Sequence, residues 1–273
     1  MMKSFSFAGW VLIGSVLVGG ATGCTGPVPL VRAHAHNDYE HRHPLTDALK
    51  HGFCSVEADV HLVDGQLLVG HDAEDLRPNR TLESLYLAPL RKRIRKNGGR
   101  VYKNGPQLTL LIDIKTDAEA TYRALHDLLA AYGDMVSSFD AGGRHEKAVL
   151  VVISGNRPRE LMMSQPLRYA GYDGRLSDLQ SQAPADFMPL ISDRWPSYFT
   201  WMGEGEMPDG EREELSRIVD RCHVFGRRLR FWATPENERV WEVLYDAGVD
   251  LINADDLARL QAFLLAKRGL AGE

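Results

Sequence analysis

The feature that most constrains the fold is a series of short apolar runs, each followed by enough residues to form a helix. Several runs are nearly continuous Val, Ile and Leu, as expected for strands buried on both faces of a parallel sheet. We expect eight strands, at Val28–Ala33, Cys54–Val60, Leu108–Ile114, Ala148–Ile153, Leu167–Tyr172, Met188–Ile191, Arg228–Ala233 and Asp250–Ile252. We expect helices at Pro44–His51, Ala118–Tyr132, Gly210–Phe225, Glu236–Ala247 and Leu257–Lys267. This alternation predicts the α/β class and a single TIM-type (β/α)8 barrel, closed or somewhat distorted.

Two segments interrupt the alternation. Val63-Asp64-Gly65-Gln66 lies between two apolar runs and predicts a hairpin turn, so that a short β-ribbon follows the second strand. Residues 154–201 are rich in Pro, Ser and aromatic residues and poor in helical patterns. We therefore expect long loops and short helices there.

The N-terminus has the pattern of an export signal. Lys3 precedes a short apolar run from Ala8 to Gly20, and small residues lead to Cys24. The pattern predicts a lipoprotein signal peptide over residues 1–23, a lipidated Cys24, a short tether over residues 24–27 and a barrel domain over residues 28–268. We therefore expect an exported bacterial lipoprotein, anchored to a membrane and facing the periplasm or the cell exterior. The alternative is ordinary cleavage near Gly23, which would leave Cys24 as a free thiol.

Charge and cysteine content exclude two classes of protein. The net charge is -5, and the only basic run, Arg91–Lys96, is typical of the solvated end of a helix. We therefore expect no nucleic-acid partner. Beyond Cys24 the chain has only Cys54 and Cys222, which offer neither a disulfide framework nor a CxxC metal site. The sequence leaves open whether these two cysteines pair, and it does not reveal the oligomeric state.

Two carboxylates on the second expected strand indicate a cation site. Glu57 and Asp59 are two residues apart, so their side chains point to the same face. Burial of both requires a positive partner, and Mg²⁺ or Ca²⁺ prefers such oxygen ligands. A pair of salt bridges at the strand end is the alternative. Asp113 and Lys115 end the third apolar strand, where they would add a third metal carboxylate and a positive charge for a substrate phosphate.

Histidines are concentrated in the same part of the chain, with seven of the ten between His34 and His71. His36 follows the first strand and His71 ends the ribbon, so the two could divide the roles of general acid and general base. His34 shares a face with His36 on strand alternation. It is therefore a candidate for the pocket wall, for a residue that orients the site, or for the working base itself.

The order of these motifs resembles a known superfamily. His36-Asn37-Asp38-Tyr39 is similar to the His-Asn-x-Tyr of eukaryotic phospholipases C, and Glu57-Ala58-Asp59 to a metal-binding Glu-x-Asp. Further similar segments are Gly70-His71-Asp72, Asp113-Ile114-Lys115, Arg230-Phe231-Trp232-Ala233 and Gly248–Asp255. The family is the phosphatidylinositol-phospholipase-C-like phosphodiesterases, which include glycerophosphodiester phosphodiesterases and sphingomyelinase D toxins. The chain looks most similar to a branch related to the fungal altered-inheritance-of-mitochondria protein.

The resemblance implies a phosphodiester hydrolase with one divalent cation, Mg²⁺ or Ca²⁺, and a small-molecule or lipid phosphodiester substrate. It assigns catalytic roles to His36, His71 and Lys115, and metal binding to Glu57, Asp59, Asp113 and Asn37. Trp232 and His34 would line the substrate pocket.

Two other functions stay open. His34-Ala35-His36 also fits the His-x-His of amidohydrolase-like or histidinol-phosphatase-like enzymes, and a noncatalytic ligand-binding lipoprotein is the third reading.

Overall fold

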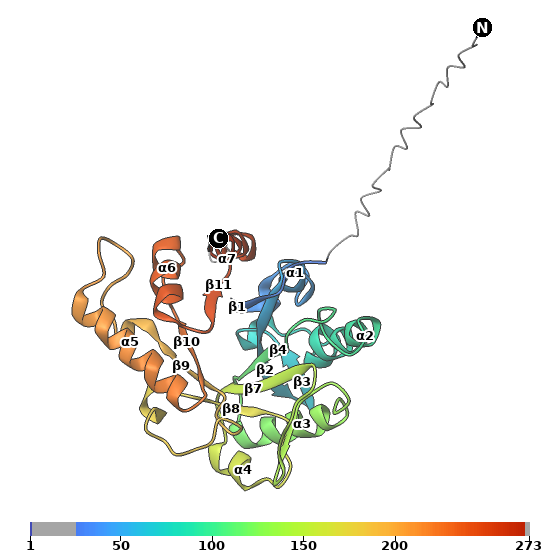
Figure 1. Ribbon diagram of the computed structural model, residues 1–273. Helices are drawn as coiled ribbons and strands as arrows, with labels where there is room; N and C mark the ends of the chain where they lie inside the picture. The colour runs from blue at the N-terminus through green and yellow to red at the C-terminus, as the bar shows by residue number, and fades with distance from the viewer. Residues whose placement is uncertain (2–25, 271–273) are drawn as a thin grey trace.

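Eight parallel strands form the centre of the computed structural model, which describes residue 1 and residues 26–270 (Figure 1). In order around the ring these strands are β1 (Leu30–Ala35), β2 (Phe53–Val63), β4 (Leu108–Ile114), β7 (Val149–Gly155), β8 (Gly171–Gly174), β9 (Leu190–Arg194), β10 (Arg228–Trp232) and β11 (Ile252–Ala254). β11 pairs with β1, and a single parallel bridge joins Arg230 of β10 to Leu251 just before β11. The ring is therefore nearly closed, and the predicted barrel is confirmed.

Helices surround the strands. They are α1 (Thr46–Lys50), α2 (Ala88–Lys96), α3 (Ala118–Ala130), α4 (Arg159–Ser164), α5 (Asp209–Val224), α6 (Glu238–Ala247) and α7 (Leu257–Leu270). In Figure 1, α2 and α3 lie on one side of the ring and α5 and α6 on the other. Each amphipathic helix buries one face, as α6 does with Val240, Trp241 and Leu244. Among the described residues, none of the helices is both long and apolar enough to cross a membrane.

The predicted β-ribbon is present. β2 pairs antiparallel with β3 (Gln66–Val69), and Val63 faces Gln66 across a two-residue turn. Asp64 and Gly65 in that turn have φ angles of 48° and 78°, the left-handed conformation that a tight hairpin turn requires. The ribbon returns the chain to the carboxyl end of the barrel and so positions His71, which follows it.

Strand ends differ systematically from the prediction. β1, β2, β7, β8, β9 and β11 each continue two or three residues further toward the carboxyl end than their apolar runs. The added residues include His34, Ser154, Asp173, Ser192 and Asn253, which are polar and buried. Hydrophobicity stops before the strand does because the carboxyl ends of these strands carry buried polar side chains.

The predicted strand Leu167–Tyr172 is largely wrong. Only its end belongs to β8, whereas Arg168 forms an antiparallel bridge with Phe139. Phe139 lies in a small hairpin, β5 (Ser138–Asp140) and β6 (Gly143–His145), which the sequence reading missed. This part of the run therefore pairs with the hairpin through Arg168 instead of joining the barrel sheet.

The side chains in the barrel interior change from apolar to polar along its axis. On β4 the inward face carries Leu111 and then Asp113, and on the neighbouring β7 it carries Val152 and then Ser154. Leu111, Phe139, Leu150, Val152, Leu190 and Leu251 form one apolar cluster of their own. The apolar layer supports the polar layer above it and leaves the polar side chains at the carboxyl ends of the strands.

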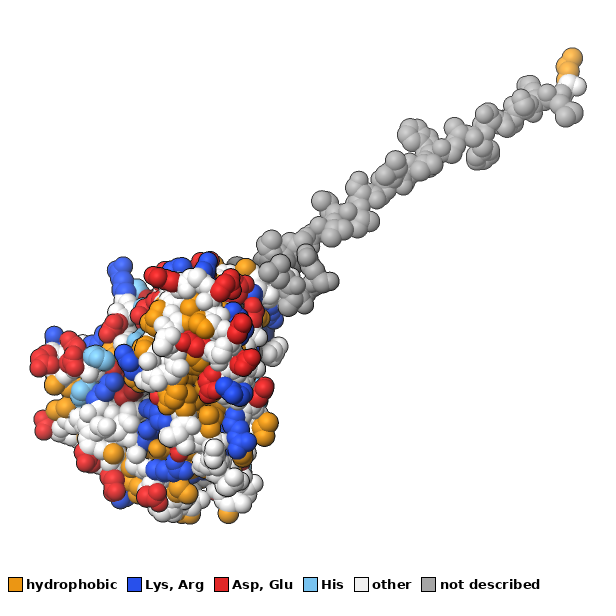
Figure 2. Space-filling model, turned by 90° about the vertical axis from the view of Figure 1, so that its left-hand side faces the viewer, with side chains coloured by type: hydrophobic (Ala, Val, Ile, Leu, Met, Phe, Trp, Pro, Cys, Tyr) orange, Lys and Arg blue, Asp and Glu red, His pale blue; other side chains and the backbone are white. Residues whose placement is uncertain are grey.

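On the outside, Figure 2 shows acidic and basic side chains interspersed on the visible face, without a continuous basic stripe.

We expect Cys54 and Cys222 to be unreactive in the folded protein. Both are free thiols in the structure, and burial raises the pKa of each to about 12. Iodoacetamide should therefore modify neither at neutral pH until denaturant is added, because the thiolate is the reactive form. Mass spectrometry of protein labelled before and after unfolding provides the check. Native modification of either residue would contradict the prediction.

Candidate active site

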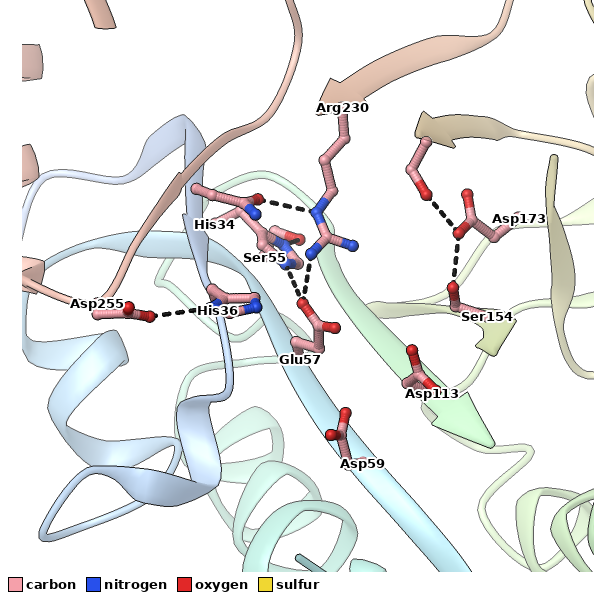
Figure 3. A network of polar contacts seen from close by, with 12 residues as sticks. His34, His36, Ser55, Glu57, Asp59, Asp113, Ser154, Asp173, Arg230 and Asp255 are labelled. Atoms are coloured by element: carbon pink, nitrogen blue, oxygen red, sulfur yellow. Dashed lines mark hydrogen bonds and ion pairs between the residues drawn. The ribbon is translucent and has the colours of Figure 1, made fainter. Parts of the chain in front are cut away.

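Three carboxylates meet at the mouth of the barrel. Asp59 of β2 pairs in register with Asp113 of β4, and Glu57 lies two residues before Asp59 on the same face. Ligand oxygens of the three side chains lie within 4.8 Å of one another. The sequence prediction that these carboxylates lie together therefore agrees with the structure (Figure 3).

Asp59 is the most enclosed of the three, with 1% of its side chain exposed. Its Oδ2 accepts hydrogen bonds from the Tyr39 hydroxyl at 2.7 Å and pairs with Lys115 Nζ at 3.0 Å and His71 Nδ1 at 3.1 Å. Its Oδ1 is buried and has no partner among the described residues. A buried carboxylate oxygen without a donor is costly, and a cation ligand would remove that cost.

Glu57 is held in its charged form. Arg230 Nη2 donates to Oε2 at 2.6 Å, and His34 Nε2 lies 3.0 Å from the same oxygen. Burial alone would raise the pKa of Glu57, but the Arg230 charge and the His34 hydrogen bond outweigh it and hold the pKa well below its usual range. Because both contacts use Oε2, Oε1 is left for another ligand.

His34 orients this glutamate. Its side chain is completely buried, and Nδ1 lies 2.7 Å from Ser55 Oγ. Burial and the nearby Arg230 charge lower the pKa of His34 to about 4, so the ring is neutral at physiological pH. A neutral ring can donate from Nε2 to Glu57 and accept at Nδ1 from Ser55. Of the three roles that the sequence left open for His34, these contacts correspond to a residue that orients the site, and His34 is not among the residues that line the cavity.

Asp113 and Lys115 complete the charge pattern. Burial raises the pKa of Asp113 to about 6, and the Lys115 charge only partly offsets this. Lys115 Nζ lies 3.2 Å from Asp113 Oδ1 and 3.0 Å from Asp59 Oδ2. Burial by itself lowers the pKa of Lys115, but the two carboxylates raise it above its usual value. Three clustered carboxylates thus share two cationic side chains, Lys115 and Arg230, which favours an additional positive charge.

Two histidines open onto one cavity of about 280 Å³ beside these carboxylates. His36 Nδ1 lies 3.0 Å from Asp255 Oδ1, and His71 Nδ1 lies 3.1 Å from Asp59 Oδ2. Burial lowers the pKa of His36, but the hydrogen bond to Asp255 reverses this and leaves the pKa raised. Each ring is therefore fixed through Nδ1, which leaves Nε2 for a substrate.

Most of the predicted site residues lie together. The cavity is lined by His36, Asn37, Glu57, His71, Asp113, Lys115, Ser154, Arg175, Arg230 and Trp232. Asn37 adopts a left-handed conformation (φ 45°) directly after His36. The three later histidines, His126, His145 and His223, do not line this cavity.

The sequence reading missed roles for four residues. Arg230, Asp255, Ser154 and Arg175 contact or line the site, but only the first two stood in segments singled out by resemblance. A polar residue directly after an apolar strand was the available signal for Ser154, and the same logic applies to Arg175 after β8.

Replacement of Gly155 by alanine should disturb Asp113. Gly155 has φ 65°, and an added Cβ would lie 2.1 Å from Asp113 Oδ1 and 2.5 Å from the Ile114 carbonyl oxygen. Gly65 is a matched control, because it has φ 78° with nothing within 4 Å. We expect Gly155→Ala to lower the free energy of unfolding by about 1–3 kcal/mol more than Gly65→Ala. Denaturant unfolding of both variants measures this, and equal losses would show that the close approach is unimportant.

Comparison with known proteins agrees with this geometry. The chain matches the AIM6-like phosphodiesterase domain over residues 22–173. It is 33% identical to Altered inheritance of mitochondria protein 6 of Eremothecium gossypii, covering 88% of this chain and 71% of that protein. It is 30% identical to the homolog of that protein in Arthroderma benhamiae, covering 85% of this chain and 82% of the homolog.

Two crystal structures share the fold. Glycerophosphodiester phosphodiesterases from Parabacteroides distasonis and Agrobacterium tumefaciens superimpose with TM-scores of 0.50 and 0.51. The first covers 87% of this chain and 98% of its own, the second 86% and 99%, and both are 16% identical to it. At this identity the likeness concerns the barrel architecture.

The predicted localisation is wrong. The curated relatives are fungal, hence eukaryotic, which contradicts an exported bacterial lipoprotein. The prediction rested on a short apolar run and small residues, a pattern that records hydrophobicity and size but does not name a compartment. The predicted signal peptide beyond residue 1 and the predicted lipidated Cys24 lie outside the described residues.

The domain match covers more than half of the chain, and a curated relative is 33% identical over most of both proteins. This chain therefore belongs to the AIM6-like phosphodiesterase family.

Proposed function

We propose that the protein is a divalent-cation-dependent phosphodiester hydrolase that uses His36 and His71 as its acid–base pair. The observation that carries the proposal is that two imidazoles, each fixed through Nδ1 by a carboxylate, line one cavity beside three clustered carboxylates. Acid–base chemistry needs both a proton acceptor and a proton donor near the scissile bond, and this pair can supply them.

The donor set fits a hard divalent cation. Glu57, Asp59 and Asp113 would hold it, with Asn37 at the edge of the same cavity. Carboxylate oxygens suit both Mg²⁺ and Ca²⁺. The unpartnered Asp59 Oδ1 is the specific feature that such an ion would satisfy. When bound, the ion would neutralise charge that develops on a phosphate oxygen.

The side chains of the protein supply the remaining chemistry. One histidine would remove the proton from water or from a neighbouring substrate hydroxyl, and the other would protonate the departing alkoxide. Lys115 stays charged between Asp59 and Asp113 and would bind a phosphate oxygen. Trp232 lines the cavity and would shield the reacting groups from water. The substrate would be a small-molecule or lipid phosphodiester, as the names of the structural neighbours suggest.

Two other readings receive less support. An amidohydrolase-like or histidinol-phosphatase-like site requires converging histidines, but His34 contacts Glu57 whereas His36 contacts Asp255. A noncatalytic binding protein has no need for two histidines fixed by carboxylates at one cavity.

Hydrolysis of bis(p-nitrophenyl) phosphate and of glycerophosphocholine by the purified protein tests the proposal. We expect turnover that EDTA abolishes and that Mg²⁺ or Ca²⁺ restores, and we expect the same cation to raise the thermal unfolding temperature. His43→Ala is the control, since His43 is exposed and lies outside the cavity. Absence of turnover together with absence of any cation effect on unfolding would overturn the proposal.

A further inference from the structure

Arg175 is the one arginine of the cavity wall that the proposed reaction leaves without a role. It directly follows β8, and about a quarter of its side chain is exposed. All its side-chain hydrogen bonds to described residues use Nη1, which contacts Asp173 Oδ2 at 2.8 Å, the Gly174 carbonyl at 3.0 Å and Ser192 at 3.3 Å. Nε and Nη2 have no partner among the described residues.

These two free nitrogens form the side of the guanidinium that binds oxyanions best. The N–H bonds of Nε and Nη2 are parallel, which matches two oxygens of one phosphate or carboxylate. Arg230, which lines the same cavity, differs from Arg175 because its Nε and Nη2 both have partners within the protein. Its Nε donates to Asn253 and its Nη2 donates to Glu57. The pair of nitrogens Nε and Nη2, here called the fork, is therefore already occupied within the protein in Arg230. Two arginines at one cavity thus differ in whether their forks are free.

The anchor of Arg175 is built into the barrel. Asp173 is completely buried, and its Oδ2 also accepts from Ser154 Oγ at 2.7 Å and Ser192 Oγ at 2.5 Å. These contacts join β7, β8 and β9, three neighbouring strands of the sheet. The guanidinium is therefore held in place before a ligand arrives, which reduces the entropy lost on binding.

Arg175 also lies on a different side of the cavity from His36. In the ring of eight strands β8 lies opposite β1, the strand that leads to His36. Figure 3 shows Asp173 and Ser154 on the far side of the site from His36 and Glu57. Among the described residues, Arg175 makes no ion pair with the three clustered carboxylates.

We infer that Arg175 forms an oxyanion subsite for a second acidic group of the substrate, a phosphate or carboxylate, on the β8 side of the cavity, across the barrel from His36. This inference rests on the proposed function, since it takes the scissile phosphodiester to lie beside Glu57, Asp59 and Asp113. It assigns the substrate class: phosphodiesters with at least one further anionic group on the part that faces β8.

Two ligands that differ by a single phosphate test the inference. Glycerophosphoinositol carries only the phosphodiester, whereas glycerophosphoinositol 4-phosphate carries an additional phosphate. Both are titrated by calorimetry with Mg²⁺ or Ca²⁺ present, in the His71→Ala background so that hydrolysis does not consume the ligand. We expect the phosphorylated ligand to bind roughly 10- to 100-fold more tightly, the range for charge-assisted hydrogen bonds.

The variants isolate the fork. Arg175→Lys keeps the charge beside Asp173 but loses the paired N–H groups, so it should remove most of this preference while leaving glycerophosphoinositol binding unchanged. Arg175→Ala should remove all of it, and the lysine variant keeps the test decisive if the alanine variant does not fold. Arg194→Ala, which removes an exposed arginine outside the cavity, should have no effect.

Equal binding of the two ligands would overturn the inference, as would no detectable binding of either. If Arg175→Lys lowered the affinity for both ligands by the same factor, the inference would also be overturned, because the fork would then hold the scissile phosphate. These outcomes are independent of turnover by the wild-type protein, on which the proposed function is judged.

Discussion

Replacing His71 with alanine is expected to lower phosphodiester turnover by about 10²- to 10⁴-fold, the contribution of a positioned acid or base. Half of the His71 side chain is exposed, so its removal should leave the barrel intact. The loss should appear in kcat, because the proton transfer belongs to the chemical step. Stopped-time assays with bis(p-nitrophenyl) phosphate, beside thermal unfolding of the same preparation, provide the measurement.

His36→Ala should behave in the same way, and the double variant should be little worse than either single variant, since the two histidines act in one reaction. His43→Ala serves as the control for a lost imidazole. A His71→Ala protein that keeps more than about a tenth of wild-type turnover would remove the residue from the acid–base pair.

Arg230→Ala is expected to cause the largest loss of stability, about 3–5 kcal/mol of the free energy of unfolding. The substitution removes the main positive charge beside Glu57, which is 5% exposed, and the donor to Asn253. A buried carboxylate left without its counter-charge accounts for the size of this cost. Urea unfolding in the presence of EDTA measures the loss without compensation by a bound cation.

Arg259→Ala is the matched control. Arg259 lies 3.4 Å from Glu238, but this pair is open to solvent, with 44% and 65% of the two side chains exposed, so the loss should stay below about 1 kcal/mol. The double variant Arg230→Met with Glu57→Gln should recover part of the stability, because no isolated charge remains buried. If Arg230→Ala is as stable as Arg259→Ala, the buried pair does not support the site.

The alternation of strands and helices, together with the motifs at the strand ends, predicted much of the fold and of the candidate site. The predicted strand Leu108–Ile114 coincides with β4, and Asp113 and Lys115 lie at its carboxyl end as expected. Two-residue spacing placed Glu57 and Asp59 on one face, since side chains alternate along any strand. These inferences succeeded because they depend on local periodicity.

Other features depend on which strands become neighbours. His34 and His36 have the spacing of a shared face, yet His34 contacts Glu57 and His36 contacts Asp255. The reason is that β1 ends at Ala35, so His36 already lies beyond the strand. Arg230 reaches Glu57 only when the ring of strands places β10 and β2 around the same interior. Sequence spacing carries no information about a contact between residues 173 positions apart.

By itself, then, the sequence determined the barrel, the face shared by Glu57 and Asp59 and the presence of two histidines near strand ends. It could not determine which nitrogen of each histidine is free, which carboxylate oxygen lacks a donor or which arginine has an unused fork. Closure of the ring decided these points, because hydrogen bonds extend only about 3 Å and their partners come from distant parts of the chain.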